Sequence, residues 1–250
     1  MSAQQPTSDE HVLTVHCPEA YGLVSAVASN LTSQGCDIFA RTVYGARASV
    51  TVGVLTTLIV VVLGSVIGAV AGYFGGWVDS LLARFTDIFF AVPFVLAAIV
   101  VMQLFKGRSS IITVVLVLAL FGWPQIARIT RGAVMSVKNE DFVTASKSLG
   151  SGRLAILIRH VMPNAAAPII VTATVSLGSF IVSEATLSFL GIGLPSTVVS
   201  WGADIATAQS ALRDHISVLL YPAGALALTV LGFIMMGDAV RDALDPKARK

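Results

Sequence analysis

The stretch ASVTVGVLTTLIVVVLGSVIGAVAGYFGGWV, residues 48–78, contains no charged side chain in 31 consecutive positions. About 20 apolar residues in a helix are enough to cross the hydrocarbon core of a bilayer. Lipid offers no hydrogen-bond partner to the backbone, so a spanning segment must satisfy its own peptide groups, as a helix does. The stretch therefore predicts a transmembrane helix over about residues 48–72, which ends in the glycine and aromatic turn around 72–77.

Four further windows without Asp, Glu, Lys, Arg or His follow at residues 88–105, 109–127, 161–183 and 216–237. Each is about as long as one helical crossing requires. The chain is therefore expected to be an all-α integral membrane protein with about five transmembrane helices. These helices are expected at about residues 48–72, 82–105, 111–134, 164–190 and 216–237.

The composition agrees with this class. Charged residues make up 12% of the 250 residues and hydrophobic ones 55%, whereas soluble domains carry roughly 25% charged residues. The net charge of +2 is too small to indicate a nucleic-acid partner. The sequence has no G-x-x-x-x-G-K-[ST] loop for a nucleotide and no recognisable catalytic or metal-ligating constellation. No cofactor is therefore expected in this chain.

The basic residues of the short loops predict the orientation, because cytoplasmic loops are enriched in Lys and Arg. The segment between the third and fourth expected helices has the strongest basic excess, so it is expected in the cytoplasm, as is the basic C-terminal tail. The loop at 191–214 and the N-terminal segment are then expected outside. The charged residues of the basic segment are Arg128, Arg131, Lys138, Lys147, Arg153 and Arg159, against Glu140 and Asp141.

Two prolines lie inside expected helices. Pro93 and Pro124 each lack the N–H that an α-helix needs and are expected to kink their helices, which neighbouring helices tolerate in a membrane protein. Such a kink either serves a moving pathway or is inert, and the sequence leaves both interpretations open.

The cytoplasmic segment 138–163 is much longer than a simple connection, which usually has about six residues. Residues 140–149 lack Gly and Pro and predict a short helix. The Gly150-Ser151-Gly152 sequence ends that helix, and residues 153–161 predict a second one. Two short helices that stand off the membrane are suited to act as a lever in the cleft of a soluble partner; the alternative is a loop that merely joins two spans.

This segment resembles the EAA loop in the permease subunits of bacterial ATP-binding cassette (ABC) importers. The family pattern is Glu-Ala-Ala, three residues, Gly, nine residues, an apolar residue, one more residue, Leu and Pro. Ala145, Gly150 and Pro163 match it by position. The loss of the family's Glu puts in doubt any salt bridge that this Glu would make. The positions that depart from the pattern hold Thr144, Ser146, His160 and Met162.

Further stretches resemble the dipeptide, oligopeptide and nickel branch of these permeases, in the same order. The resemblance covers about residues 39–250 and implies an ABC importer transmembrane domain. The similar stretches are GYFGGWVDSLL at 72–82, RHVMPNAAAPIIV at 159–171, EATLSFLGIGLP at 184–195, SWG at 200–202 and GDAVRDALDP at 237–246.

The resemblance implies a transport subunit of the bacterial inner membrane that is not itself an enzyme. A coupling helix in 138–163 would dock a cytoplasmic ATPase, which binds the ATP and Mg²⁺. A second permease subunit, forming a heterodimer, and an extracytoplasmic solute-binding protein would complete the complex. Di- or oligopeptides are the expected solutes; the alternatives are nickel or another small solute, or a truncated or fused remnant without function. The residues implied to dock the ATPase are Asp141, Ala145, Gly150, Arg153 and Pro163.

Glu184 is the single acid within the expected helix 164–190. An ionisable group inside a membrane is costly and by default indicates function. Because Glu184 lies near the outer end of that helix, a second interpretation is a hydrogen-bonded interfacial group beside Ser183 and Thr186. The sequence favours neither.

Residues 1–38 differ from the rest, since they are polar and have neither a spanning run nor a signal-peptide pattern. Alternation at 11–16 predicts a strand, and the periodicity of 21–34 predicts a helix. The stretch at 11–38 resembles part of the ACT domain of formyltetrahydrofolate deformylase. Three interpretations remain: a regulatory module that binds an amino acid, a fusion in which this segment replaced a first span, or an unrelated amphipathic tail. A fusion is preferred, because the resemblance changes abruptly near residue 38.

Overall fold

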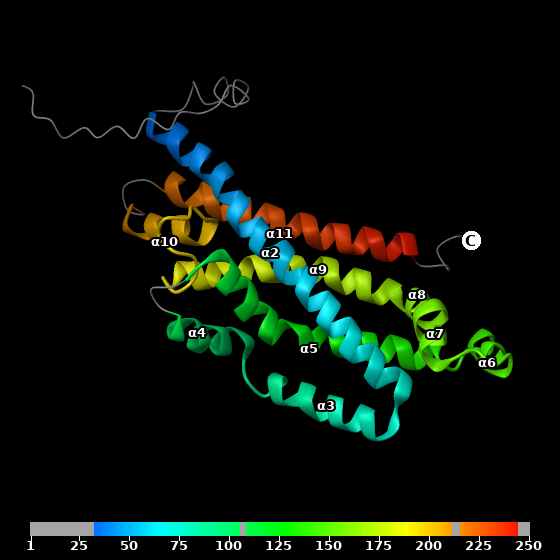
Figure 1. Ribbon diagram of the computed structural model, residues 1–250. Coiled ribbons are helices and arrows are strands. Elements are labelled where there is room, and N and C mark those ends of the chain that lie inside the picture. The colour runs from blue at the N-terminus through cyan, green and yellow to red at the C-terminus, as the bar shows by residue number, and fades with distance from the viewer. Residues whose placement is uncertain (1–32, 106–108, 212–215, 245–250) are drawn as a thin grey trace, which may run out of the picture. The chain divides into compact units, whose positions relative to one another are not determined.

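The computed structural model describes residues 33–105, 109–211 and 216–244, which form helices and connecting turns without a strand. The expected strand at 11–16, and the expected helix from residue 21 up to residue 32, lie outside the described residues. Figure 1 shows the arrangement of the helices. The elements are α2 (Ser33–Phe74), α3 (Gly76–Phe90), α4 (Phe94–Leu104), α5 (Ile111–Val137), α6 (Asp141–Ser148), α7 (Arg153–Ile156), a π-helical turn (Leu157–Val161), α8 (Met162–Asn164), α9 (Ala166–Phe189), α10 (Trp201–Ala211) and α11 (Ser217–Leu244).

Four of these helices are long and apolar enough to cross a membrane: α2 from Ile38, α5, α9 and α11. The pair α3 and α4 supplies a fifth crossing if the two count as one span. The prediction of an all-α membrane protein with about five transmembrane helices is therefore confirmed. The 37 residues of α2 from Ile38 to Phe74 extend about 55 Å, well beyond the roughly 30 Å of the hydrocarbon core.

Three glycines on α2 bring its backbone into direct contact with that of α5. A Cβ atom on any of them would collide with the backbone of α5, since a carbonyl oxygen lies too close to each. Both sets of residues recur every four positions, so two helix ridges meet without side chains between them. The glycines are Gly64, Gly68 and Gly72, and the facing carbonyl groups belong to Trp123, Ala127 and Arg131.

The prediction of one helix over 82–105 is wrong. Helices α3 and α4 are separated by a short break and meet at an angle of 78°. Pro93 follows the break with an extended ψ of 123°; it cannot donate to the preceding turn and disfavours a helical residue before it, so the chain leaves the helix there. Pro124 differs, because it lies within the continuous helix α5.

Helix α10 was not expected, because the sequence predicts an external loop over 191–214. It is too short to span a membrane and lies against α9 and α11. Gly202 is essential to this contact, because a Cβ there would collide with the backbone of Ala185 on α9. In Figure 1, α10 lies at one end of the helices, and α6, α7 and α8 lie at the other.

The contact between α2 and α5 makes a first prediction. Gly68→Ala places a methyl group against the Ala127 carbonyl, and overpacking of this kind costs about 1–3 kcal/mol. The control is Gly232→Ala on α11, where a Cβ meets no atom within 4 Å; there, Ala should be neutral or stabilising by up to about 1 kcal/mol. Equilibrium unfolding in mixed detergent micelles measures the change in the free energy of unfolding for each variant. Equal changes in the two variants would contradict the proposed contact.

Candidate functional site

Helices α6 and α7 form a hairpin that projects between the ends of α5 and α9 (Figure 1). Lys138 caps α5, and α6 begins three residues later. Gly150 has a φ of +79°, a left-handed conformation that glycine adopts without strain. The Ser151 N–H donates to the Ser146 carbonyl over 3.2 Å. Glycine at this position thus ends α6 and turns the chain back into α7.

One face of α6 packs into the membrane-spanning helices through Val143, which is 0% exposed. Val143 belongs to an apolar cluster that also contains Ala69 of α2, Val134 of α5, and Ile156 and Val161 from the second arm of the hairpin. This cluster, termed the inner cluster below, joins α6 to two transmembrane helices. Through this cluster, α6 and its neighbour α7 pack together with α2 and α5.

The opposite face of the hairpin exposes large apolar side chains. Leu149 is 86% exposed and Leu154 is 62% exposed, and Phe142 is also exposed. Exposed apolar side chains outside the lipid-facing spans mark a candidate surface for contact with another protein or with the membrane surface. Sequence reasoning missed these three residues, because it followed the positions of the family pattern rather than exposure.

The five residues that the resemblance assigned to docking are all exposed. They are distributed along the hairpin and the helix that follows it, so the structure does not gather them into a single compact site. Asp141 begins α6, Ala145 lies within it, Gly150 forms the turn, Arg153 begins α7 and Pro163 lies in α8.

At the other end of the molecule, Glu184 is 0% exposed. The Ser188 hydroxyl, one helical turn further on, donates to its carboxylate over 2.7 Å. The hydroxyls of Ser49 on α2 and Ser200 before α10 lie near this carboxylate, and its second oxygen, Oε2, has no hydrogen-bond partner among the described residues. The neighbours expected from sequence, Ser183 and Thr186, bond to carbonyls of their own helix. Glu184 is thus a buried junction of α9, α2 and the segment before α10.

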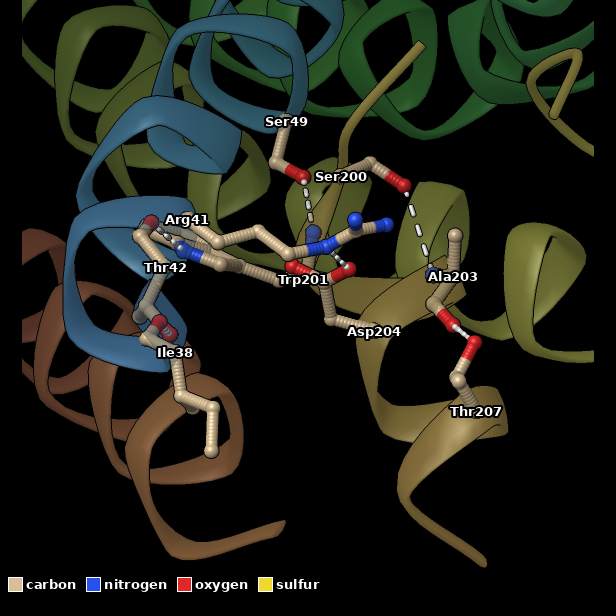
Figure 2. A network of polar contacts seen from close by, with 9 residues as sticks. All are labelled: Ile38, Arg41, Thr42, Ser49, Ser200, Trp201, Ala203, Asp204 and Thr207. Atoms are coloured by element: carbon tan, nitrogen blue, oxygen red, sulfur yellow. Dashed lines mark hydrogen bonds and ion pairs between the residues drawn. The ribbon is translucent and has the colours of Figure 1, made fainter. Parts of the chain in front are cut away.

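Helix α10 is attached to the first turns of α2 from Ile38 by polar contacts (Figure 2). The indole Nε1 of Trp201 donates to the Thr42 carbonyl over 2.8 Å, and its backbone N–H donates to Ser49 Oγ over 3.3 Å. The Arg41 Nε donates to Asp204 Oδ1 over 2.6 Å. Burial raises the pKa of Asp204 above its ordinary value, while the Arg41 guanidinium acts in the opposite direction.

Within the described residues, no group of three or more His, Cys, Asp or Glu side chains is positioned to hold a metal ion. A groove of about 400 Å³ between α9, α10 and α11 is lined by Val182, Ile205, Ala223 and other apolar residues. It carries no polar groups that converge on a ligand.

Comparison with known proteins finds the family "Binding-protein-dependent transport system inner membrane component", which matches residues 64–250. The oligopeptide transport system permease protein OppC of Bacillus subtilis is 39% identical over 86% of this chain and 70% of its own length. The dipeptide permease DppC of the same organism is 38% identical over 86% of this chain and 67% of its own. The glutathione permease GsiD of Escherichia coli O6:K15:H31 is 39% identical over 87% of this chain and 71% of its own length.

Solved structures share the fold. A chain of the MetNI methionine ABC transporter in inward-facing conformations superposes with a TM-score of 0.69 at 17% identity. The match covers 82% of this chain and 96% of that one. An amino acid ABC transporter superposes with a TM-score of 0.63 at 15% identity, over 88% of this chain and 98% of that one.

The attachment of α10 makes a second prediction. Trp201→Phe removes the indole N–H that binds the Thr42 carbonyl, and the loss of a buried hydrogen bond costs about 1–3 kcal/mol. Hydrogen exchange of the backbone amides of residues 201–211 should accelerate. The matched control is Trp77→Phe, because Trp77 is 77% exposed. If α10 exchanged no faster in the Trp201 variant than in this control, the attachment would be refuted.

Proposed function

The chain belongs to the family of binding-protein-dependent transport system inner membrane components, and from this premise we propose that it carries di- or oligopeptides while α6 and α7 dock a cytoplasmic ATPase. The family assignment makes it a multi-pass inner-membrane permease subunit of an ABC importer, a transport component rather than an enzyme. The solute, the docking residues and the individual partners form the proposal.

The observation that carries the docking proposal is the exposure of Leu149 and Leu154 beside a buried Val143. Large apolar side chains that are exposed together outside the lipid-facing spans are typical of a surface that binds a protein. An apolar tip with Asp141 and Arg153 near its two ends suits a groove with an apolar floor and charged walls. Asp141, Ala145, Gly150, Arg153 and Pro163 belong to the proposed contact, with Leu149 and Leu154 as its anchors.

The proposed mechanism is mechanical coupling. The partner ATPase binds and hydrolyses ATP with Mg²⁺, and its opening and closing displaces α6. Val143 transmits that displacement to Val134 of α5 and Ala69 of α2, since all three share the inner cluster. A second permease subunit would form the other wall of the pathway, and an extracytoplasmic binding protein would deliver the solute.

Peptides are the proposed solute class because the similar permeases are named for oligopeptide, dipeptide and glutathione transport. Nickel or another small solute is the alternative, since identity below 40% does not fix a substrate. A remnant without function is the other alternative, and solute uptake by the assembled complex distinguishes it from a working permease. Mass spectrometry of the solute that co-purifies with the cognate binding protein decides between the substrate classes.

Glu184 is proposed as a positioning group rather than as a group that contacts the solute. Its carboxylate accepts a hydrogen bond from Ser188 of its own helix and lies near Ser49 of α2 and Ser200 before α10, so we expect it to hold the outer ends of these helices together. Transport of the solute should therefore tolerate Glu184→Gln, which keeps hydrogen-bonding capacity, better than Glu184→Leu. Uptake per molecule of assembled complex measures this, and equal uptake by the two variants would contradict the proposal.

The docking surface makes a further prediction. Leu149→Asp places a charge where an apolar anchor is proposed, and the loss of a central anchor costs about 2 kcal/mol or more, a loss of at least roughly thirtyfold in affinity. Pull-down of the cognate ATPase by the solubilised permease measures this loss of affinity. The control is Leu190→Asp, an exposed leucine at the far end of α9. ATPase capture that is reduced equally by both variants, or by neither, would contradict docking through Leu149.

A further inference from the structure

An ion pair at the cytoplasmic end of α5 lies outside the docking surface and was not singled out from the sequence. Arg131 donates from Nε to Asp79 Oδ1 over 2.5 Å and from Nη2 to Asp79 Oδ2 over 2.7 Å. Asp79 lies in the first turn of α3, and its side chain is 17% exposed. A two-point contact between a guanidinium and a carboxylate fixes direction as well as distance. It therefore connects α5 rigidly to the start of α3.

A second contact attaches α5 to the other side of the same corner. The Lys138 ammonium, at the end of α5, donates to the carbonyl of Gly72 over 2.6 Å. Gly72 lies near the end of α2, and the chain then passes into α3 through Gly75 and Gly76, which both have positive φ. Lys138 and Arg131 thus hold the corner between α2 and α3 from both sides.

These two cations lie on either side of the residue through which α5 contacts α6. Val134 is 0% exposed and shares the inner cluster with Val143 of α6. The end of α5 therefore contacts α6 by apolar packing and α3 by an ion pair. A displacement of α6 that moves Val134 necessarily moves Arg131, which lies one helical turn away on the same helix.

The other end of the α3–α4 pair is held by different contacts. Ala98 and Met102 of α4 belong to an apolar cluster with Val114 and Leu118, in the first half of α5. The break at Pro93, with its angle of 78°, lies between this cluster and the ion pair. Helix α3 is thus bound to α5 by the ion pair near α6 and, in its second half, by Phe85 and Phe89 against Trp123. Helix α4 is bound to the first half of α5, and the break lies between α3 and α4.

We propose that the ion pair between Arg131 and Asp79 transmits the movement of α6 to α3, so that α3 changes its angle to α4 at the Pro93 break during transport. This inference rests on the proposed function, because it requires α6 to be driven by an ATPase. Arg131 and Asp79 are then positioning residues, which contact neither ATP nor the solute. The alternative role for the pair is a static clamp that only stabilises the fold.

The same two helices supply a matched control. Arg128 and Asp87 also join α5 to α3, but through one hydrogen bond of 3.0 Å, and their side chains are exposed. The guanidinium of Arg128 also lies over the ring of Phe90, 4.1 Å from its centroid. An exposed pair of this kind contributes little, so its loss should leave the connection between α3 and α5 intact.

The test uses proteoliposomes that contain the chain with its cognate second permease, ATPase and binding protein. Asp79→Asn and Arg131→Gln should retain ATPase association and ATP hydrolysis within about twofold, while solute uptake per ATP falls about tenfold, a common size for coupling between sites. The charge-exchanged double variant Asp79→Arg with Arg131→Asp should recover a substantial part of the wild-type solute uptake per ATP. Asp87→Asn should behave like the wild type.

A second measurement follows the angle between α3 and α4 itself. Spin labels at Arg84→Cys on α3 and Leu104→Cys on α4, in a background without Cys17 and Cys36, should show a distance that changes when vanadate traps the ATPase. Asp79→Asn should abolish the change, and Asp87→Asn should keep it.

The outcomes separate the inference from the function on which it rests. Asp79→Asn complexes with wild-type uptake per ATP and an unchanged distance response would overturn the transmission role alone. Uptake and hydrolysis that fall together, in proportion to the amount of assembled complex, would identify the pair as a static clamp. A wild-type complex that binds no ATPase would overturn the proposed function and, with it, the inference.

Discussion

The structure depends on the close approach of α2 to α5. In lipid there is no hydrophobic driving force between helices, so association relies on van der Waals contact and on interhelical hydrogen bonds. Gly64, Gly68 and Gly72 permit that contact because each lies against a carbonyl of α5 that leaves no room for a side chain. The register fixed in this way brings Gly72 to Lys138 and Ala69 into the inner cluster. The corner between α2 and α3, which Lys138 contacts, is therefore a consequence of the glycine contact.

The two ends of the molecule differ in which side chains they bury and which they expose. At the end with α10, polar groups are buried: Trp201 and Asp204 join α10 to α2, while Glu184 bonds to Ser188 of its own helix. At the end with α6, the apolar groups of Leu149 and Leu154 remain exposed. Attachment at one end and an exposed apolar surface at the other are consistent with the proposal that a partner protein acts on α6. Between them, the break at Pro93 divides α3 from α4.

The sequence predicted those features that depend on local composition. The lengths of the stretches without charged residues located the spans. Gly150 located the turn between α6 and α7, because its φ of +79° favours glycine. Features that depend on contacts between distant residues were missed. The 78° break at Pro93 was expected only as a kink. Helix α10 was taken as a loop, because Trp201 and Gly202 gain their role from partners on α2 and α9. For Glu184 the sequence left two interpretations open, and it did not single out Ser188, the hydrogen-bond partner one helical turn further on.

The central claim is that the hairpin of α6 and α7 lies in the cytoplasm and is covered by the ATPase. A single cysteine at Leu149, in a chain without Cys17 and Cys36, tests it by labelling with a membrane-impermeant maleimide. The account predicts labelling in inside-out vesicles stripped of the ATPase, protection when the cognate ATPase is restored, and no labelling in right-side-out vesicles. Labelling from the outside, or labelling that the ATPase does not reduce, would contradict it.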